Sequence, residues 1–314
     1  MASCGIDLGG TKCLGVILDG GEVVAQTRVP TPRGTDAVVD ALVGVVDALG
    51  GPSALDAVGV GAPGLVDRTG ALQVAPNLAV DPGLELRSVL EDRLGLAVVV
   101  DNDATCAAWG ERELGAARGF DDVILVTQGT GIGGGIIVGG RVHRGANGFA
   151  GEIGHMVVDP QGPPCPCGQR GCWERFASGS GLGRLGREAA ARPGTGTGAG
   201  RMVELAGGEV EAIRGEHVTA ALGEGDTQAA EVMERFAWWT ALGLANLANI
   251  FDPQVFVLGG GLAMAGEAFL APTRAAFHDL LMGADWRPAA RIVAPELGHR
   301  AGAIGAAGLA AGSR

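Results

Sequence analysis

The sequence predicts an α/β protein built from two related lobes. Three short strands open the chain, and helices and strands then alternate, which is typical of α/β folds. A strand–glycine turn–strand unit occurs twice, as IDLGGTK at 6–12 and as VTQGTGIGG at 126–134. Such a repeat predicts two lobes with a cleft between them, and ligands of α/β proteins bind at the carboxyl ends of strands, where these turns would lie.

The elements of the first half follow from the spacing of apolar residues. Runs rich in β-branched residues predict strands, and apolar residues three and four apart predict helices. The expected strands lie at 4–8, 13–18, 22–29, 57–61 and 97–101, and the expected helices at 36–49, at about 85–94 and from Asp101-Asn102-Asp103 to Leu114.

The second half follows the same rules. We expect strands at 122–127, 133–138, 254–258 and 291–294, and helices at 179–191, 217–222, 226–250, 266–282 and 301–311. Gln128-Gly129-Thr130-Gly131 should form the second glycine turn. The stretch RPGTGTGAGR at 192–201 has low complexity and predicts a flexible loop. The last helix consists of small residues, which suits close packing.

Composition narrows the class of protein. A length of 314 residues fits two ordinary domains or one large one, and 47% hydrophobic residues suffice for a core. No apolar run is long enough to span a bilayer, and the first residues lack the basic region of a secretory leader. The net charge of −12 argues against nucleic-acid binding, which needs a basic face. We expect a cytoplasmic protein that binds neither nucleic acid nor membranes.

A cluster of metal-ligating residues lies near the middle of the chain. His155, Cys165, Cys167 and Cys172 are spaced H-x9-C-x-C-x4-C. Three thiolates and one imidazole complete a tetrahedral zinc shell with no position for water, so the expected zinc is structural. The alternative is a pair of disulfides or unrelated buried cysteines. Cys165 and Cys167 are too close in sequence to bridge easily, and a reducing compartment favours metal.

Three glycine-rich turns follow apolar strands, at Gly9-Gly10-Thr11, Gly129-Thr130-Gly131 and Gly259-Gly260-Gly261. Glycine lets backbone N–H groups approach phosphate oxygens closely, although each turn alone could be an ordinary one. None matches the Walker motif. Asp7, at the end of the first strand, could hold Mg²⁺. Lys12, the only lysine, could mark a place that needs a compact ammonium group.

Other polar residues have two possible interpretations. Asn102-Asp103 stands between a strand and a helix and could be a helix cap or part of the site. Asn77 follows a proline and could be an ordinary turn residue. The remaining cysteines, Cys4, Cys13 and Cys106, fit small buried hydrophobic positions.

Taken together in this order, several motifs resemble the ROK family of sugar kinases and sugar-responsive repressors, and within it the ATP-dependent glucokinases. They are DLGGTK at 7–12, Asn102-Asp103, Gly129-Thr130-Gly131, EIGH at 152–155 and CPCGQRGCWE at 165–174, with WGE at 109–111 and FDP at 251–253. The resemblance extends from Gly5 to about the C-terminal helix. One departure is Gln128, where the family usually has an apolar residue.

The resemblance implies a two-lobed actin-like ATPase (ribonuclease H-like) fold with a ligand cleft and a structural zinc loop. We place a small lobe at 1–105 with 301–314, and a large lobe at 106–300 with the zinc loop 155–172. It also implies transfer of phosphate from ATP to the 6-hydroxyl of glucose, with Asp103 as the general base and Mg²⁺ bound with ATP.

The resemblance further implies which residues touch the ligands. The expected sugar-binding residues are Asn77, Asn102, Asp103, Glu152, His155 and Glu174. The expected nucleotide-binding residues are Asp7, Gly9, Gly10, Thr11, Lys12, Gly129, Thr130, Gly131, Gly259, Gly260 and Gly261. The expected zinc ligands are His155, Cys165, Cys167 and Cys172. Family members are commonly dimers or tetramers, so a homodimer or homotetramer is expected.

Several alternatives stay open at this point. The sugar could be N-acetylglucosamine, N-acetylmannosamine or fructose, and the phosphate donor could be polyphosphate. A sugar-responsive repressor would need a DNA-binding segment ahead of the first glycine turn, but the first strand begins by residue 4. A non-catalytic sugar-binding zinc protein is the third possibility.

Overall fold

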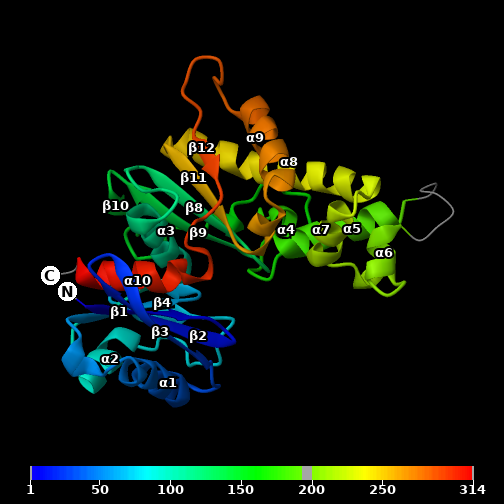
Figure 1. The fold of residues 1–314 in the computed structure, drawn as a ribbon. Coiled ribbons are helices and arrows are strands. Elements are labelled where there is room, and N and C mark those ends of the chain that lie inside the picture. Colours follow the sequence, from blue (N-terminus) through cyan, green and yellow to red (C-terminus); the bar gives the residue numbers. More distant parts are fainter. Residues whose placement is uncertain (1, 193–199, 313–314) are drawn as a thin grey trace. The chain divides into compact units, whose positions relative to one another are not determined.

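The computed structural model describes residues 2–192 and 200–312. The chain forms two compact units (Figure 1). The first unit contains Met1–Leu125, Gly134–Gly151 and Pro295–Arg314, and the second contains Val126–Gly133 and Glu152–Ala294. This partition gives residues 106–125, 134–151 and 295–300 to the first unit, whereas the division expected from the sequence gives them to the large lobe. The expected lobe boundaries stay a prediction.

The first sheet has five strands in the order β3-β2-β1-β4-β7. These strands are β1 (Ser3–Leu8), β2 (Lys12–Asp19), β3 (Glu22–Pro30), β4 (Ala57–Ala62) and β7 (Val98–Asn102). The first three form an antiparallel meander, and β4 and β7 continue the sheet parallel to β1. The short hairpin β5 (Leu65–Val66) and β6 (Leu72–Val74) follows β4. Strand β7 is therefore an edge strand of the five-stranded sheet.

Helices cover both faces of this sheet (Figure 1). On one face lie α1 (Thr35–Ala48) and α2 (Leu86–Leu94), and on the other lies α10 (Ala301–Ala311), against which α3 (Asp103–Leu114) packs. The small residues of α10 allow an unusually close approach: a Cβ at Gly5 would lie 1.9 Å from the carbonyl oxygen of Ala303. Close packing of this helix, expected from its composition, is confirmed.

A buried carboxylate secures the chain segment that leads into α10. Glu111 of α3 is completely buried, and its oxygens accept backbone N–H bonds from Ala116 at 2.9 Å, Glu296 at 3.1 Å and Leu297 at 2.9 Å. Three donors satisfy a carboxylate that no longer reaches water. The segment before α10 is thereby attached to α3 within the first unit.

The second sheet has the order β10-β9-β8-β11-β12. Its strands are β8 (Val123–Gln128), β9 (Ile132–Val138), β10 (Arg141–Val142), β11 (Val255–Gly259) and β12 (Arg291–Val293). Numbering the five strands of each sheet along the chain, both sheets have the order third, second, first, fourth, fifth. The internal repeat inferred from the two glycine turns is therefore a repeat of sheet topology.

The remaining helices belong to the second unit. They are α4 (Glu174–Ala177), α5 (Gly179–Ala190), α6 (Arg201–Leu205), α7 (Gly215–Gly223), α8 (Thr227–Phe251) and α9 (Glu267–Leu280), with 3₁₀ turns at Ile153–His155, Val210–Ala212 and Gly261–Ala265. Two further 3₁₀ turns, Pro52–Ala54 and Gly298–Arg300, lie in the first unit. The long helix α8 packs against α9, α5, α7 and α4 and forms the centre of this unit. None of the helices in the described part of the chain is both long and apolar enough to cross a membrane.

The differences from the expected elements are local. Gln128 is the last residue of β8 and not the first residue of the turn. Arg201, expected at the end of a flexible loop, begins α6. Most of that expected loop, residues 193–199, lies outside the described residues. The two-residue strands and the four-residue helix α4 were not expected, because elements this short carry no measurable periodicity.

Candidate active site and metal centre

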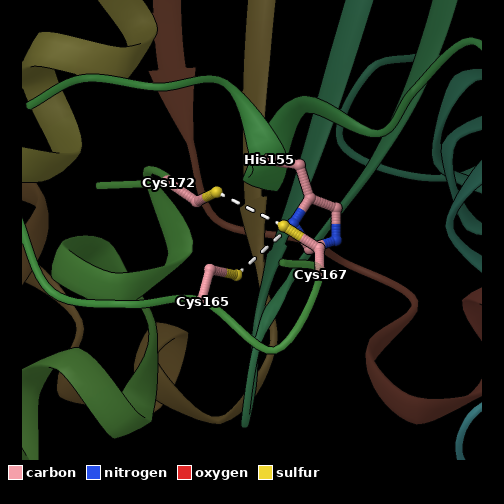
Figure 2. A group of neighbouring side chains, drawn as sticks. All are labelled: His155, Cys165, Cys167 and Cys172. Carbon is pink, nitrogen blue, oxygen red and sulfur yellow. Dashed lines mark hydrogen bonds between the residues drawn. The ribbon is translucent and has the colours of Figure 1, made fainter. Parts of the chain in front are cut away.

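Four side chains of the second unit form a candidate metal centre (Figure 2). The ligand atoms of His155, Cys165, Cys167 and Cys172 all lie within 4.8 Å of one another. Cys167 Sγ lies 3.6 Å from Cys172 Sγ, and Cys165 Sγ lies 3.7 Å from His155 Nδ1. A tetrahedron of Zn–S bonds of about 2.3 Å has edges of about 3.8 Å, so these distances fit a zinc ion at the centre.

The state of the sulfur atoms agrees with a metal centre and not with disulfides. All six cysteines are free thiols, and a separation of 3.6 Å far exceeds the ~2.05 Å of an S–S bond. Burial raises the pKa of the Cys165 and Cys172 thiols. A bound divalent cation reverses this effect, because it stabilises the thiolate form directly. Cys4, Cys13 and Cys106 are buried, as expected.

Two glutamates flank the imidazole of the metal centre. His155 Nε2 lies 3.8 Å from Glu152 Oε2, and His155 Nδ1 lies 3.9 Å from Glu174 Oε1. Nδ1 is the ring nitrogen nearest the cysteine sulfurs, so Nε2 is left to face Glu152. The expected sugar-binding residues of the second unit, Glu152, His155 and Glu174, are therefore brought together.

Trp173 secures the end of this loop on helix α8. Its side chain is completely buried, and its indole Nε1 donates a 2.7 Å hydrogen bond to the carbonyl oxygen of Trp239. A Cβ at Gly243 would lie only 2.0 Å from the indole, so the absence of a side chain there makes room for the ring. Phe176 stacks on Trp239 with ring centroids 4.1 Å apart. These contacts determine where the neighbouring Glu174 stands.

In the first unit, the first glycine turn meets an expected sugar-binding residue. The turn at Gly9-Gly10-Thr11 joins β1 to β2, and Gly9 N–H donates to the carbonyl oxygen of Lys12 at 3.0 Å. A Cβ at Gly10 would lie 2.7 Å from the carbonyl oxygen of Asn77, so only glycine permits this approach. Lys12 is exposed at the start of β2.

Asn102 is the last residue of β7 and Asp103 is the first residue of α3. The pair was expected to be either a helix cap or part of the site, and the two residues differ in this respect. Asn102 is the N-cap of α3, since its Oδ1 accepts hydrogen bonds from the N–H groups of Ala104 and Thr105 at 2.9 and 3.1 Å. Its Nδ2 donates to the carbonyl oxygen of Gly64 at 3.1 Å. Asp103 is the first helical residue, so its carboxylate is not needed as the cap.

Burial shifts the protonation of the acids at this end of the first sheet. It raises the pKa of Asp103, partly offset by a hydrogen bond from the N–H of Ala104. Burial, reinforced by the negative charge of Asp103 and opposed by Lys12, raises the pKa of Asp7 to about 6. A raised carboxyl pKa makes a stronger base at neutral pH, and a bound Mg²⁺ would relieve the repulsion between the two acids.

A cavity of about 600 Å³ in the second unit is lined by parts of the second and third glycine turns, although Gly131, Gly259 and Gly260 are not among its lining residues. Gly129, Thr130 and Gly261 line it, with Gln128, Gly179, Ser180, Gly183, Arg187, Arg214, Gly215, Glu216, Thr219 and Leu262. Two expected nucleotide turns that are far apart in sequence therefore meet in one cavity. Its volume is in the range of ordinary small-molecule sites.

Two helix N-termini open onto the same cavity. Helix α5 begins at Gly179, whose N–H donates to the carbonyl oxygen of Gly129 at 2.7 Å, and Ser180 Oγ donates to the carbonyl oxygen of Thr130 at 2.8 Å. Helix α7 begins at Gly215, beside Arg214. Helix N-termini carry partial positive charge and unpaired N–H groups, so this cavity suits phosphate.

Gln128 supports this turn from the protein side. It is buried, and its Nε2 donates to the carbonyl oxygen of Ala177 at 2.7 Å and to Thr240 Oγ1 at 3.2 Å. Gly260 has a φ of 91°, and a Cβ there would lie 2.3 Å from the Gln128 carbonyl oxygen. The polar residue that departs from the family pattern thus ties β8 to the end of α4 and to α8.

Sequence reasoning missed several residues of the cavity wall, among them Ser180, Arg187, Arg214 and Thr219. One signal was present in the sequence. The helix expected at 179–191 contains glycines at 179, 181, 183 and 186, and because glycine weakens a helix, so many of them indicate that a neighbouring segment packs closely against it. The neighbour is α7, since a Cβ at Gly183 would lie 3.0 Å from the Cα of Arg214.

Comparisons with known proteins agree with this arrangement. A family model described as the ROK family matches residues 3–313. A glucokinase of Streptomyces coelicolor is 41% identical over 310 residues, which cover 98% of this chain and 96% of that protein. The crystal structure of a ROK family glucokinase from Streptomyces griseus in complex with glucose and AMPPNP has a TM-score of 0.84 and 42% identity over 99% of both chains.

A ROK hexokinase from Thermus thermophilus also has a TM-score of 0.84, with 35% identity over 99% of this chain and 98% of that one. The agreement over the whole length of the chain confirms the expected actin-like α/β fold. The Cys₃His group expected from the sequence spacing is also formed. The chain therefore belongs to the ROK family.

Proposed function

We propose that this protein is an ATP-dependent glucokinase, which transfers the γ-phosphoryl group of ATP to the 6-hydroxyl of glucose. The observation that carries the proposal is the match of 42% identity over 99% of both chains to a ROK family glucokinase crystallised with glucose and AMPPNP. The 41% identity to a second glucokinase supports the same substrate.

Asp103 is the proposed general base. It takes the proton from the sugar 6-hydroxyl, whose oxygen then forms a bond to the γ-phosphorus while the bond to the β–γ bridging oxygen breaks and ADP leaves. The raised pKa of the Asp103 carboxyl supports this role. Mg²⁺ bound with ATP would neutralise charge on the transferred group, and Asp7 is the carboxylate proposed to hold it.

The ligand contacts proposed for the remaining residues follow the family resemblance. Asn77, Asn102, Glu152, His155 and Glu174 bind sugar hydroxyls. The glycine turns, with Lys12, bind the nucleotide. The cavity lined by Gly129, Thr130 and Gly261, with its two helix N-termini, supports the placement of the nucleotide in the second unit.

Zinc is the metal proposed for the four-ligand centre. Its ligands are three thiolates and His155 Nδ1, and a closed tetrahedral site of this kind is structural. The bound ion would hold the loop that carries His155 and Glu174. The free thiols agree with the proposed cytoplasmic location, where cysteines stay reduced. A homodimer or homotetramer is proposed as the assembly, which sedimentation equilibrium would test.

A coupled assay for glucose 6-phosphate with ATP, Mg²⁺ and glucose tests the function. We expect turnover with glucose to exceed turnover with N-acetylglucosamine, N-acetylmannosamine and fructose, and ATP to exceed polyphosphate as donor. Near-zero turnover on glucose by folded, zinc-loaded protein would refute the proposal, and rapid turnover on an acetylated sugar would redirect it to another hexose.

The variant Asp103→Asn tests the base. It should lower kcat by about 10²–10⁴-fold, since general base catalysis contributes about that much, while glucose binding changes little. Asp92→Asn, on the exposed side of α2, serves as the matched control and should retain full activity. If Asp103→Asn retained wild-type kcat, the base assignment would be wrong.

A further inference from the structure

A second cavity, of about 340 Å³, lies in the first unit along the edge strand β7. Its wall combines apolar and charged residues. Val66 and Val98 are buried apolar members, and the charged members are Arg68, Arg87, Arg144, Asp67 and Asp101. None of these residues belongs to the proposed reaction. The wall carries three guanidinium groups and two carboxylates, and Glu91, which pairs with Arg87 from outside the wall, balances the third guanidinium.

Each arginine is held by one bond and has further N–H groups to offer. Arg144 Nε donates to Asp101 Oδ2 at 2.7 Å, Arg68 to the carbonyl oxygen of Gly145 at 2.6 Å, and Arg87 Nε to Glu91 Oε1 at 3.2 Å. A guanidinium carries five N–H donors. Among the described residues, no other hydrogen bond of these three side chains is found. The anchors orient the side chains, and the terminal nitrogens remain for a ligand.

The two carboxylates of the wall already have hydrogen-bond donors of their own. Asp67 accepts hydrogen bonds from Thr69, Ala71 and Gln73 within its own hairpin. Asp101 is buried, and its Oδ1 accepts from the N–H of Asn102 at 2.9 Å while its Oδ2 holds Arg144. Arg144 is paired with Asp101 of the wall and Arg87 with Glu91 outside it, whereas Arg68 donates to a backbone carbonyl oxygen, so a phosphate would be bound by the remaining N–H donors and not by an excess of positive charge.

We propose that this cavity binds a small phosphate ester. Arginine forks match the oxygen geometry of phosphate and form charge-assisted bonds with it. Val66 and Val98 offer an apolar wall to a short carbon chain, which inorganic phosphate lacks. The volume is near the lower end of small-molecule sites, which suits a ligand of a few carbon atoms.

The cavity is one residue away from the proposed catalytic machinery. Asp101 joins Arg144 to the backbone of Asn102, and Asp103 follows. A phosphate that draws Arg144 towards itself acts on the strand end that carries both residues. A ligand in this cavity is therefore placed to act as an effector of phosphoryl transfer. This effector role rests on the proposed function, whereas binding of the phosphate ester does not.

Calorimetric titration with glycerol 3-phosphate and with inorganic phosphate tests the site at low salt, with glucose and AMPPNP present to fill the substrate sites. We expect one glycerol 3-phosphate to bind per chain. Its affinity should exceed that of inorganic phosphate by about fourfold for each methylene group that the apolar wall buries. Arg87→Ala should weaken binding about 10-fold or more, as for loss of a charged hydrogen bond.

Arg93→Ala is the matched control. Arg87 and Arg93 lie on the same helix, each side chain is 48% exposed and each has a carboxylate partner, but Arg93 is outside the cavity. Arg93→Ala should bind like the wild type. Three outcomes would overturn the proposal. The first is no heat with either phosphate compound, and the second is equal binding by the two variants. The third is binding of citrate without binding of phosphate.

The same variants separate this site from the proposed function. If AMPPNP and glucose do not bind, the glucokinase proposal fails, yet the comparison of Arg87→Ala with Arg93→Ala still reports on the cavity. In the kinase assay, glycerol 3-phosphate should change the rate of the wild type and of Arg93→Ala but not of Arg87→Ala. An unchanged wild-type rate at saturating ester would overturn the effector role.

Discussion

The thiol Sγ of Cys165 lies 3.0 Å from Oε1 of Glu174. This contact joins a proposed zinc ligand to a proposed sugar ligand. Glu174 also lies beside the second glycine turn, since a Cβ at Gly131 would be 2.6 Å from its other carboxylate oxygen. One glutamate at the start of α4 therefore contacts the metal loop and the second glycine turn.

Removal of zinc should weaken glucose binding. Without the ion, His155 loses the bond that orients its ring and Glu174 loses an ordered neighbour. We expect glucose affinity to fall about 10–100-fold, as for loss of one hydrogen bond to a charged group. Isothermal titration of glucose into chelator-treated protein would measure the change, and re-addition of zinc should restore it. Equal glucose affinity with and without zinc would show that the centre does not support the sugar site.

Filling the space beside Trp173 should destabilise the second unit. Gly243→Ala places a methyl group against the indole, and overpacking of this kind costs about 1–3 kcal/mol. Gly44→Ala is the matched control within helix α1, since a Cβ there meets nothing within 4 Å. It should stabilise the protein by about 0.5–1 kcal/mol. Urea unfolding would measure both changes, and equal effects would contradict the packing argument.

The raised pKa of Asp7 predicts a specific dependence of stability on pH. Its pKa is about 6 in the folded protein and about 3.9 when unfolded, so between these values the native state binds more protons. The contribution of Asp7 to stability is therefore complete below about pH 3.9 and is lost as pH rises through 6.

Asp7→Asn should remove this dependence. In the absence of Mg²⁺ and nucleotide, we expect the variant to gain about 2 kcal/mol relative to the wild type between pH 4 and pH 7, allowing for partial exposure of Asp7. Urea unfolding at a series of pH values gives the difference. A stability difference that does not change with pH would mean that Asp7 titrates normally.

Gln128 and Thr240 should be energetically coupled. Gln128→Leu leaves the Ala177 carbonyl and the Thr240 hydroxyl without their donor, at a cost of about 1–3 kcal/mol. The Thr240 hydroxyl keeps its own hydrogen bond to the Phe236 carbonyl oxygen at 3.1 Å. Thr240→Val breaks the same Gln128–Thr240 bond as Gln128→Leu, so the double variant should lose less stability than the sum of the single variants. We also expect Gln128→Leu to raise KM for ATP more than KM for glucose, because Gln128 supports the turn proposed to bind the nucleotide. Simple additivity in the double-mutant cycle would refute the coupling.

The candidate metal centre is the part of the site that local sequence predicts most completely. Its four ligands lie within 18 residues, and their residue types and spacing are enough to predict that they converge. Asp7, Asn102 and Asp103 could be located in the same way, since each stands where a strand ends. The repeat of the strand–turn–strand unit was also predicted, whereas the order of the five strands in each sheet came from the structure.

The cavity around Gly129 required the tertiary structure. Gly261 is far from Gly129 in sequence, and Arg187 and Arg214 have no motif of their own; only the packing of α5 against α7 brings them to one wall. Gln128 is a similar case. The sequence gives no reason for a polar residue in an apolar strand, and only the structure shows that its amide donates hydrogen bonds to Ala177 and Thr240.

The sequence by itself determined the α/β class, the repeated strand–turn–strand unit, the four candidate metal ligands and the acids at the strand ends, because these depend on apolar period and short-range spacing. Tertiary structure alone decided that Trp173 fills the space left by Gly243, that Glu174 touches Cys165, and that three arginines surround a cavity beside β7. The reason is physical: such contacts depend on side-chain shape and on how separate helices and strands pack, and no local pattern records either.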